Sequence, residues 1–205
     1  MADRIDIETE MDLLATLERG EAITQLVLSK RLSVSVGLIN ALLKRAAKKG
    51  QAKARAVPPR RWAYYLTPKG FTEKSRLVAT YLDSSLAFFR EARAGYVRLF
   101  AHLQTSGACR IVLVGGGELS EIAILAAREA GVEIIGLLDY RSNSEYVHGL
   151  PILRHLCGID AMIPLVITDS RSPQGAYDEV RAQYETRRIE APSFLRISIN
   201  PLRGA

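Results

Sequence analysis

The first part of the chain places apolar residues at the spacing of amphipathic helices. Residues 6 to 19 show this period, which stops at Gly20. A short run then presents Leu28 and Leu32 on one face and is followed by a tight turn. Ser35 stands where a helix N-cap is expected. The helix after it has a core face formed by Val36, Ile39, Leu42, Leu43 and Ala46. The pattern predicts a helix-turn-helix.

Two strand-like runs follow, on either side of residues 57 to 60. The adjacent prolines Pro58 and Pro59 force a turn and exclude a helix, so the runs predict a hairpin, or wing. Thr67-Pro68 has the composition of a helix start, with proline at the first helical position. Residues 1 to 70 are therefore predicted to form a winged helix-turn-helix domain of the α+β type.

A long helical pattern continues from there to about residue 102. Its apolar residues exceed what one helix needs to cover a small domain; they include Leu77, Tyr81, Leu82, Leu86, Phe89, Val97, Leu99 and Phe100. We interpret the surplus as a dimer interface, so residues 71 to 106 are a predicted linker and dimerisation helix. A helix that only caps its own chain is the alternative.

The second half changes to short apolar runs, which are typical of buried parallel strands. Residues 110 to 114 and 132 to 138 are such runs, with a glycine turn and an amphipathic helix between them. The alternation continues with strand patterns at residues 149 to 153, 162 to 168 and 194 to 199, and a helical pattern at 176 to 188. Residues 107 to 205 are therefore predicted to form a small Rossmann-like parallel sheet, and the chain as a whole an α/β fold.

Composition narrows the class of protein further. The N-terminus carries acidic residues where a signal peptide would carry basic ones, and no apolar run approaches the roughly 20 residues that span a bilayer. The cysteines Cys109 and Cys157 form no CxxC pair, which indicates a reducing compartment without a disulfide framework or zinc. We therefore expect a soluble cytoplasmic protein with no metal site and no membrane partner.

The net charge of +6 is unevenly distributed. Residues 1 to 105 contain 18 basic and 10 acidic residues, which gives +8, and the remainder contains 10 and 12, which gives −2. Between Ala22 and Thr72 there are eleven Lys or Arg residues and no Asp or Glu. Such a region suits a polyanionic partner. A solvated basic face is the alternative.

The position of these charges suggests which polyanion it is. The outer face of the second helix in the helix-turn-helix is small, polar and basic, as a DNA major groove requires. The hairpin is also basic and suits phosphates or the minor groove. The predicted DNA-binding residues are Ser35, Gly37, Asn40, Ala41, Lys44, Arg45, Lys48, Lys53, Arg55, Arg60 and Arg61.

Two runs of this region resemble MarR-type winged helix-turn-helix transcriptional regulators: TQLVLSKRLSVSVGLINALLKRAAKKG and YYLTPKGFTEKSRLVATYL. The likeness is greatest to the EPS-associated branch, which is found with exopolysaccharide genes, and it covers residues 5 to 90. Its most specific parts are Ser35-x-Gly37-x-x-Asn40 and Leu66-Thr67-Pro68-x-Gly70. The resemblance implies that the protein binds duplex DNA as a homodimer. A winged helix that serves only protein contacts is the alternative.

The glycine turn of the second half has the form of a dinucleotide-binding fingerprint. Gly115-x-Gly117-x-x-Ser120 opens a helix, and Asp139 follows 24 residues after Gly115 at the end of the next strand. The glycines let a pyrophosphate approach the helix N-terminus, and a carboxylate at that strand end can accept ribose hydroxyls. Ser120 in place of glycine or alanine, and the acidic Glu118 nearby, weaken the match. A βαβ unit without a ligand is the alternative.

A second resemblance covers about 45 residues and is carried by VLVGGGELSEIAILAAREAGVEIIGLLDY with the later GLPIL. These runs resemble the Rossmann-like half-domain of nucleotide-sugar dehydratases and sugar acyltransferases. The resemblance implies a nucleotide pocket lined by Gly115, Gly117, Glu118 and Asp139. The predicted ligand-binding residues are Gly115, Gly116, Gly117, Glu118, Leu119, Ser120, Asp139 and Tyr140. The candidate ligands are NAD(H) and a nucleotide sugar.

Catalytic candidates are few in this sequence. His102, His148 and His155 are scattered, and no nucleophile-elbow, Tyr-x-x-x-Lys or P-loop motif occurs. We therefore predict no catalytic residue and expect that the chain is not an enzyme. The predicted function is a dimeric transcriptional regulator that senses a nucleotide-type effector, with polysaccharide genes as candidate targets. The alternatives are a regulator whose second half only dimerises, and a small NAD- or nucleotide-sugar-dependent enzyme with a winged-helix interaction module.

Overall fold

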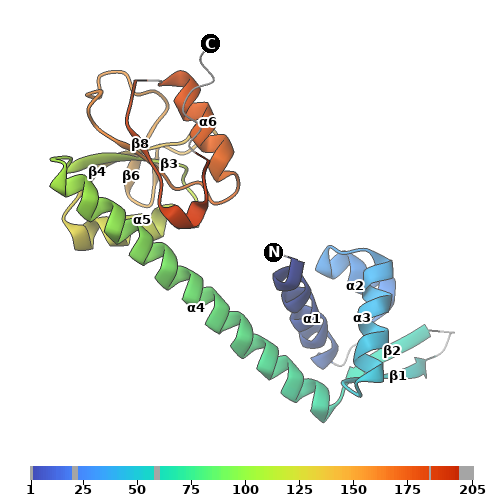
Figure 1. The fold of residues 1–205 in the computed structure, drawn as a ribbon. Coiled ribbons are helices and arrows are strands. Elements are labelled where there is room, and N and C mark those ends of the chain that lie inside the picture. Colours follow the sequence, from blue (N-terminus) through green and yellow to red (C-terminus); the bar gives the residue numbers. More distant parts are fainter. Residues whose placement is uncertain (1, 20–22, 58–60, 185, 199–205) are drawn as a thin grey trace. The chain divides into compact units, whose positions relative to one another are not determined.

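The computed structural model describes residues 2–19, 23–57, 61–184 and 186–198, and Figure 1 traces the chain. Contacts between residues divide the chain into two compact units, Met1–Leu86 and Ala87–Ala205. A single helix, α4 (Pro68–Thr105), has residues in both units. Each unit has its own hydrophobic core.

The first unit is a winged helix-turn-helix. It contains α1 (Ala2–Glu18), α2 (Gln25–Leu32) and α3 (Val36–Lys48), followed by strands β1 (Ala52–Val57) and β2 (Arg61–Leu66) and the start of α4. The N-cap predicted at Ser35 is confirmed, because its Oγ accepts a hydrogen bond from the N–H of Leu38 at 3.2 Å. Ser33 ends α2 with a left-handed backbone, φ 54°. A short side chain at that position tolerates the sharp turn between the two helices.

The core of this unit lies between α1 and the inner face of α3. The predicted core face of α3 is confirmed for Ile39, Leu42, Leu43 and Ala46, which are all buried. Val36 differs, with 41% of its surface exposed, because it is the first residue of the helix and lies at the edge of the core. The other buried apolar residues come from neighbouring elements: Leu13, Leu14, Leu17, Ile23, Leu28, Ala52 and Leu77.

The hairpin is joined to α4 by one threonine. Strands β1 and β2 pair in an antiparallel register that runs from Ala52 opposite Leu66 to Val57 opposite Arg61. The Thr67 Oγ1 accepts from the N–H of Gly70 at 3.0 Å, which caps α4 as the sequence predicted. The N–H of Thr67 donates to the carbonyl oxygen of Gln51 at 3.0 Å, and its hydroxyl is shared between the carbonyl oxygens of Gly50 at 2.7 Å and Gln51 at 3.0 Å. The first turn of α4 therefore holds the base of the hairpin in place.

The second unit is built, within the described residues, on a six-stranded sheet. The strand order is β5 (Tyr146–Val147), β6 (Leu150–Leu153), β4 (Glu133–Leu138), β3 (Arg110–Val114), β7 (Leu165–Ile167) and β8 (Ile189–Glu190). All neighbouring pairs are parallel except β5 with β6. Numbered along the chain without β5, the parallel strands stand in the order 3-2-1-4-5. This is a Rossmann-like order, in which the direction of winding reverses between β3 and β7.

Helices cover both faces of this sheet (Figure 1). One face packs against the C-terminal half of α4 and against α5 (Glu118–Ala130), and the other against α6 (Pro173–Gln183). Side chains alternate along β3, so that Ile111 and Leu113 face the first layer while Val112 and Val114 face the second. The continuous apolar run that predicted a buried strand reflects this burial on both sides.

The end of the chain differs from the sequence prediction. Residues 194 to 199 were expected to form a last strand, but Ser193–Leu195 is a short 3₁₀ helix. The ring of Phe194 packs edge-on against Tyr96 and Phe88 of α4. This packing against a helix, together with Pro192 just before it, outweighs the local strand preference of the segment. Within residues 186–198, which the structure describes, the last strand is β8, and it pairs with β7.

The apolar residues of α4 divide into three groups. Leu77 is buried in the core of the first unit, and Ala92, Tyr96, Phe100 and Leu103 are buried in the core of the second. The stretch between them exposes Val78 (36%), Leu82 (52%), Leu86 (49%), Phe88 (40%) and Phe89 (37%). Part of the apolar surplus is thus used within the chain, and part faces outward.

No single helix among the described residues is both long and apolar enough to cross a membrane. Helices α2 and α3 meet that test only when taken as a pair, and a bend of 110° separates them.

Candidate functional site

The first candidate site is the outer face of α3 with the neighbouring strand β1. Gly37, Ala41, Lys44 and Lys48 are exposed on α3, and Asn40 is half-buried among them. Lys53 and Arg55 are exposed on β1. Ser35 is exposed, but its hydroxyl oxygen is used to cap the helix. The face therefore presents lysines and one amide at helical spacing.

Acidic charge reaches this surface from a neighbouring helix. The carboxylate of Glu10 in α1 lies 2.9 Å from the guanidinium of Arg45 and 3.7 Å from the ammonium of Lys49. The acid-free stretch of sequence therefore does not correspond to an acid-free surface. Arg45, which was predicted to bind DNA, is already paired at one end of α3, whereas no ion pair of Lys44 or Lys48 is found among the described residues.

Two predicted residues of the hairpin tip cannot be placed. Arg60 lies outside the described residues, and Arg61 begins β2, with only its backbone described. Trp62, the next residue of β2, pairs with Ala56 and has 58% of its surface exposed.

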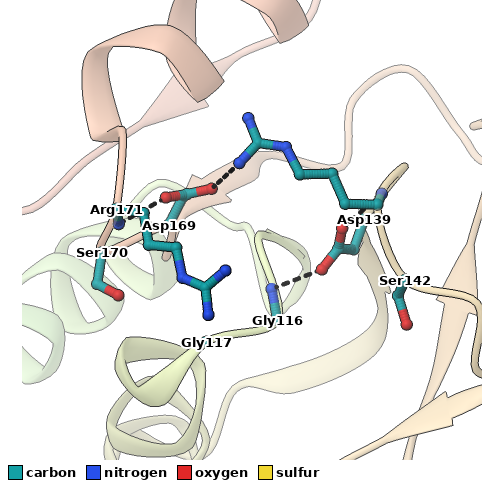
Figure 2. Close-up of a pocket in the computed structure, with 8 residues that line it drawn as sticks. Gly116, Gly117, Asp139, Ser142, Asp169, Ser170 and Arg171 are labelled. Atoms are coloured by element: carbon teal, nitrogen blue, oxygen red, sulfur yellow. Dashed lines mark hydrogen bonds and ion pairs between the residues drawn. The ribbon is translucent and has the colours of Figure 1, made fainter. Parts of the chain in front are cut away.

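The second candidate site is a cavity of about 220 Å³ in the Rossmann-like unit. It opens at the carboxyl ends of β3, β4 and β7, where the winding of the sheet reverses. Open α/β sheets bind ligands in the crevice at this position. Figure 2 shows its lining residues: Gly116, Gly117, Asp139, Arg141, Ser142, Asp169, Ser170 and Arg171.

The three glycines of the turn have different roles. Gly115 has a left-handed backbone, φ 99°, and a Cβ there would lie 2.8 Å from the backbone of Asp169. The N–H of Gly116 donates to Asp139 Oδ2 at 3.2 Å. Gly117 is the N-cap of α5, and a Cβ on it would lie 3.3 Å from the Ser170 hydroxyl. Gly115 thus serves the packing of the strands, while Gly116 and Gly117 border the cavity.

The other predicted ligand-binding residues lie around the turn in different environments. Glu118 is exposed at the start of α5. Leu119 and Ser120 have buried side chains, and the Ser120 hydroxyl donates to the carbonyl of Gly117 at 2.5 Å. Only the backbone of these two residues can therefore face a ligand. The serine hydroxyl stabilises the turn, which explains why a glycine or alanine is not required there.

Tyr140 lies beside the cavity rather than in its lining. Its hydroxyl donates to the side-chain oxygen of Gln183 in α6 at 2.7 Å. Burial raises the pKa of Tyr140, so the hydroxyl remains protonated and acts as a donor to α6. Together with Gly115, Tyr140 lines a smaller cavity of about 30 Å³ between the strand ends and α6.

Five lining residues were not among the predicted site residues: Arg141, Ser142, Asp169, Ser170 and Arg171. The last three follow β7, a strand that the sequence placed in the sheet but not beside β3. One signal in the sequence points to them. The tetrapeptide Asp139-Tyr-Arg-Ser after β4 recurs as Asp169-Ser-Arg-Ser after β7. Each tetrapeptide supplies an aspartate and an arginine to the same cavity.

Comparison with known proteins gives no family for the chain. No protein-family model matches it, and no curated protein matches it. Among solved structures, 39% of the chain matches 61% of MepR, a transcription regulator of the Staphylococcus aureus multidrug efflux pump MepA, with 17% identity and a TM-score of 0.34. Human N-acetylserotonin methyltransferase matches 92% of the chain over 74% of its own, with 12% identity and a TM-score of 0.32.

The O-methyltransferase NcsB1 from neocarzinostatin biosynthesis matches 100% of the chain over 68% of its own, with 14% identity and a TM-score of 0.29. The prediction that the chain is not an enzyme is contradicted by these comparisons, because the matches that extend over nearly the whole chain are methyltransferases. At such identities and TM-scores, none of the three matches assigns an activity to the chain.

Proposed function

We propose that the protein is a DNA-binding transcriptional regulator whose second unit binds a nucleotide-type ligand. The observation that carries this proposal is the outer face of α3, which bears exposed lysines, while the opposite face of the helix is buried in the core. The hairpin beside this helix has exposed Lys53 and Arg55. A helix of this kind fits a major groove, and a basic hairpin next to it reaches the sugar–phosphate backbone.

On α3, Lys44 and Asn40 have different expected roles. Lys44 carries a charge without a carboxylate partner among the described residues, and suits a phosphate or a guanine edge. Asn40 lies one turn before it and has a side-chain amide, which can contact adenine with two hydrogen bonds. The amide distinguishes bases, whereas the lysine charges mainly add affinity.

Asn40→Ala should reduce affinity for the preferred DNA site by about 1–3 kcal/mol and leave affinity for random DNA almost unchanged. Lys48→Ala is the matched comparison, since the loss of a phosphate contact should weaken binding to both DNAs alike. Fluorescence anisotropy titrations on a selected site and a scrambled site measure both effects. Equal losses on the two DNAs for Asn40→Ala would reassign this residue to backbone positioning.

The exposed apolar residues of α4 support a homodimer. Val78, Leu82, Leu86 and Phe89 follow one another at spacings of three and four, so they form a stripe on one side of the helix. A stripe of this kind in a long helix suits packing against the same helix of a second copy. A dimer would also place two α3 helices on successive half-sites of duplex DNA.

Phe89→Glu should convert the dimer to a monomer and abolish cooperative binding to paired half-sites, because a carboxylate would be buried without a partner. Leu125→Glu on α5 is the control, since Leu125 is also an exposed apolar residue (47%) but lies outside the stripe. Light scattering measures the mass of each variant. If Phe89→Glu remains dimeric, the interface lies elsewhere.

The ligand site of the proposal is the cavity at the reversal of the sheet. Its glycine turn, the N-terminus of α5 and Asp139 are the parts from which Rossmann-like folds build nucleotide sites. The candidate ligands are NAD(H) and a nucleotide sugar. A thermal-shift panel of NAD(H), NADP(H), uridine-diphosphate sugars, CoA and S-adenosylmethionine tests the class, followed by DNA titrations with any ligand that binds. A ligand that changes DNA affinity would support sensing.

An enzyme that acts on a nucleotide-type substrate in the same cavity is the second candidate function. The observation that favours it is the gathering of two carboxylates and two guanidinium groups around the glycine turn, since such groups can position and polarise a substrate. The winged helix would then serve as an interaction module. Mass spectrometry of the ligands after incubation with the protein distinguishes the two, because only an enzyme yields a product.

A further inference from the structure

The cavity in the second unit is flanked by two copies of the same local motif. Asp139-Tyr-Arg-Ser follows β4 and Asp169-Ser-Arg-Ser follows β7, the two strands on either side of β3. In both turns the aspartate Oδ1 accepts the N–H of the arginine two residues later, at 2.9 Å for Arg141 and 2.8 Å for Arg171. The repeated turn therefore sets one arginine on each side of the glycine turn.

The carboxylates of this motif are largely used inside the protein. Asp139 accepts N–H groups from Arg141 and from Gly116, and Asp169 accepts N–H groups from Arg171 and Ser172. Both side chains thus act as acceptors that hold the loops in place. Each carboxylate accepts two hydrogen bonds inside the protein and keeps further acceptor positions.

The guanidinium groups, by contrast, retain most of their donors. Among the described residues no hydrogen bond or ion pair to the Arg171 guanidinium is found, and Figure 2 shows this group directed toward the glycine turn. Arg141 lies 3.7 Å from Asp169 Oδ2, too far for a hydrogen bond, with 65% of its side chain exposed. These free, positively charged donors favour a ligand that carries anionic hydrogen-bond acceptors.

The start of α5 adds to this preference. The first N–H groups of a helix lack partners within the helix and carry partial positive charge. Glu121, also in the first turn of α5, lies 3.1 Å from Nδ1 of His148. Glu118 remains exposed in the first turn. Its charge and those of Glu121, Asp139 and Asp169 oppose an anion, so the two arginines and the helix N-terminus have to outweigh them.

We infer that the cavity binds a phosphate group of its ligand in a clamp formed by Arg171 and Arg141. Arg171 is the primary contact because its guanidinium has no partner within the part of the chain that the structure describes. Arg141 is the second contact and gives up its weak ion pair with Asp169 when the phosphate arrives. Guanidinium groups bind phosphate oxygens with paired, charge-assisted hydrogen bonds. The inference rests on the proposed ligand site and names the part of the ligand that is recognised there.

The size of the cavity agrees with a partial enclosure of the ligand. Pockets that enclose a whole drug-sized ligand have volumes of about 300–1,000 Å³, and this one has about 220 Å³. A diphosphate and an adjoining sugar are a better match than a complete dinucleotide. The rest of a larger ligand would extend from the open side.

Calorimetric titration of the full chain with pyrophosphate, ADP and adenosine tests the clamp. Wild type should bind pyrophosphate and ADP, and ADP more tightly than adenosine. Arg171→Gln should weaken binding of pyrophosphate and ADP by about tenfold or more, while Arg171→Lys should lose less. Arg128→Gln, at the exposed end of α5, is the control and should bind like wild type.

A second variant should change the affinity for pyrophosphate in the opposite direction. Asp169→Asn keeps Oδ1 as an acceptor for its two N–H groups but removes the charge that holds Arg141, so pyrophosphate should bind more tightly, by about threefold. Unchanged or weaker binding would overturn the role of Arg141. Circular dichroism spectra identical to that of wild type would show that each variant is folded.

The outcomes separate this inference from the proposed function. ADP binding that is unaffected by Arg171→Gln would overturn the clamp and leave the nucleotide site standing. Pyrophosphate binding that depends on Arg171, without any preference for ADP, would support the clamp and contradict the nucleotide class. If adenosine binds as tightly as ADP, the phosphate is not recognised and the clamp is overturned.

Discussion

Replacing Gly115 with alanine should lower the free energy of unfolding of the second unit by about 3–5 kcal/mol. The backbone of Gly115 has a φ of 99°, which side chains rarely allow. The added Cβ would also lie 2.8 Å from three atoms of Asp169, two of them backbone atoms. These atoms cannot move freely, because the neighbouring Thr168 is held on both sides: its N–H donates to the carbonyl oxygen of Val114 at 2.8 Å, and its buried hydroxyl donates to that of Gly115 at 2.6 Å.

Gly107→Ala is the matched control for this prediction. Gly107 has a similar φ of 84°, but a Cβ there would have nothing within 4 Å. The free energy of unfolding of this variant should fall by about 1–2 kcal/mol, the cost of a left-handed backbone at a residue that has a Cβ. Hydrogen exchange of peptides from β3, followed by mass spectrometry, reports the local stability of the second unit separately from the first. Equal losses for the two variants would show that the contact with Asp169 does not matter.

The consequence of Gly115→Ala for function follows from the same geometry. A displacement of Asp169 would also move Arg171, whose N–H is held by that carboxylate. Any ligand bound through Arg171 should therefore be lost together with stability. DNA binding by the first unit should persist, because that unit has its own core.

Replacing Gly70 with alanine should destabilise the first unit by about 3 kcal/mol or more, and is expected to abolish DNA binding. Gly70 lies in the first turn of α4, where a Cβ would come 2.0 Å from the carbonyl oxygen of Gln51. That oxygen accepts the N–H of Thr67 at 3.0 Å and shares its hydroxyl with the carbonyl oxygen of Gly50. Relief of the clash requires the hairpin to separate from α4, so the bonds that position β1 would be broken.

Gly37→Ala is the control for Gly70→Ala, because it should stabilise the first unit rather than destabilise it. Gly37 is also helical, but the nearest atom to an added Cβ is the Ser35 hydroxyl oxygen at 4.0 Å. Alanine should therefore stabilise α3 by about 0.5–1 kcal/mol. Urea unfolding monitored by the fluorescence of Trp62, the one tryptophan of the chain, compares both variants. A stable Gly70→Ala variant would show that α4 and the hairpin can separate at little cost.

Local sequence accounts for much of the winged helix. The core face of α3 and the caps at Ser35 and Thr67 depend on residues within one or two turns, so the pattern predicts them directly. The charge of the DNA-facing surface, by contrast, depends on residues that are far apart in the sequence. The Glu10 carboxylate is 35 residues from Arg45 in sequence, and the packing of α1 beside α3 brings them together. A count of charges along the chain could not include this neutralisation.

The candidate ligand site also combines features that the local sequence predicts with features that depend on tertiary structure. The glycine turn, the helix after it and the acid at the end of β4 belong to one βαβ unit, whose connections are local and whose handedness is general, so the sequence alone determined them. Asp169 and Arg171 join them only because β7 pairs with β3 on the side opposite β4. Strand order depends on the burial of both faces of the whole sheet, which no short stretch encodes. The tertiary structure therefore decided that the two Asp-x-Arg-Ser turns face one cavity.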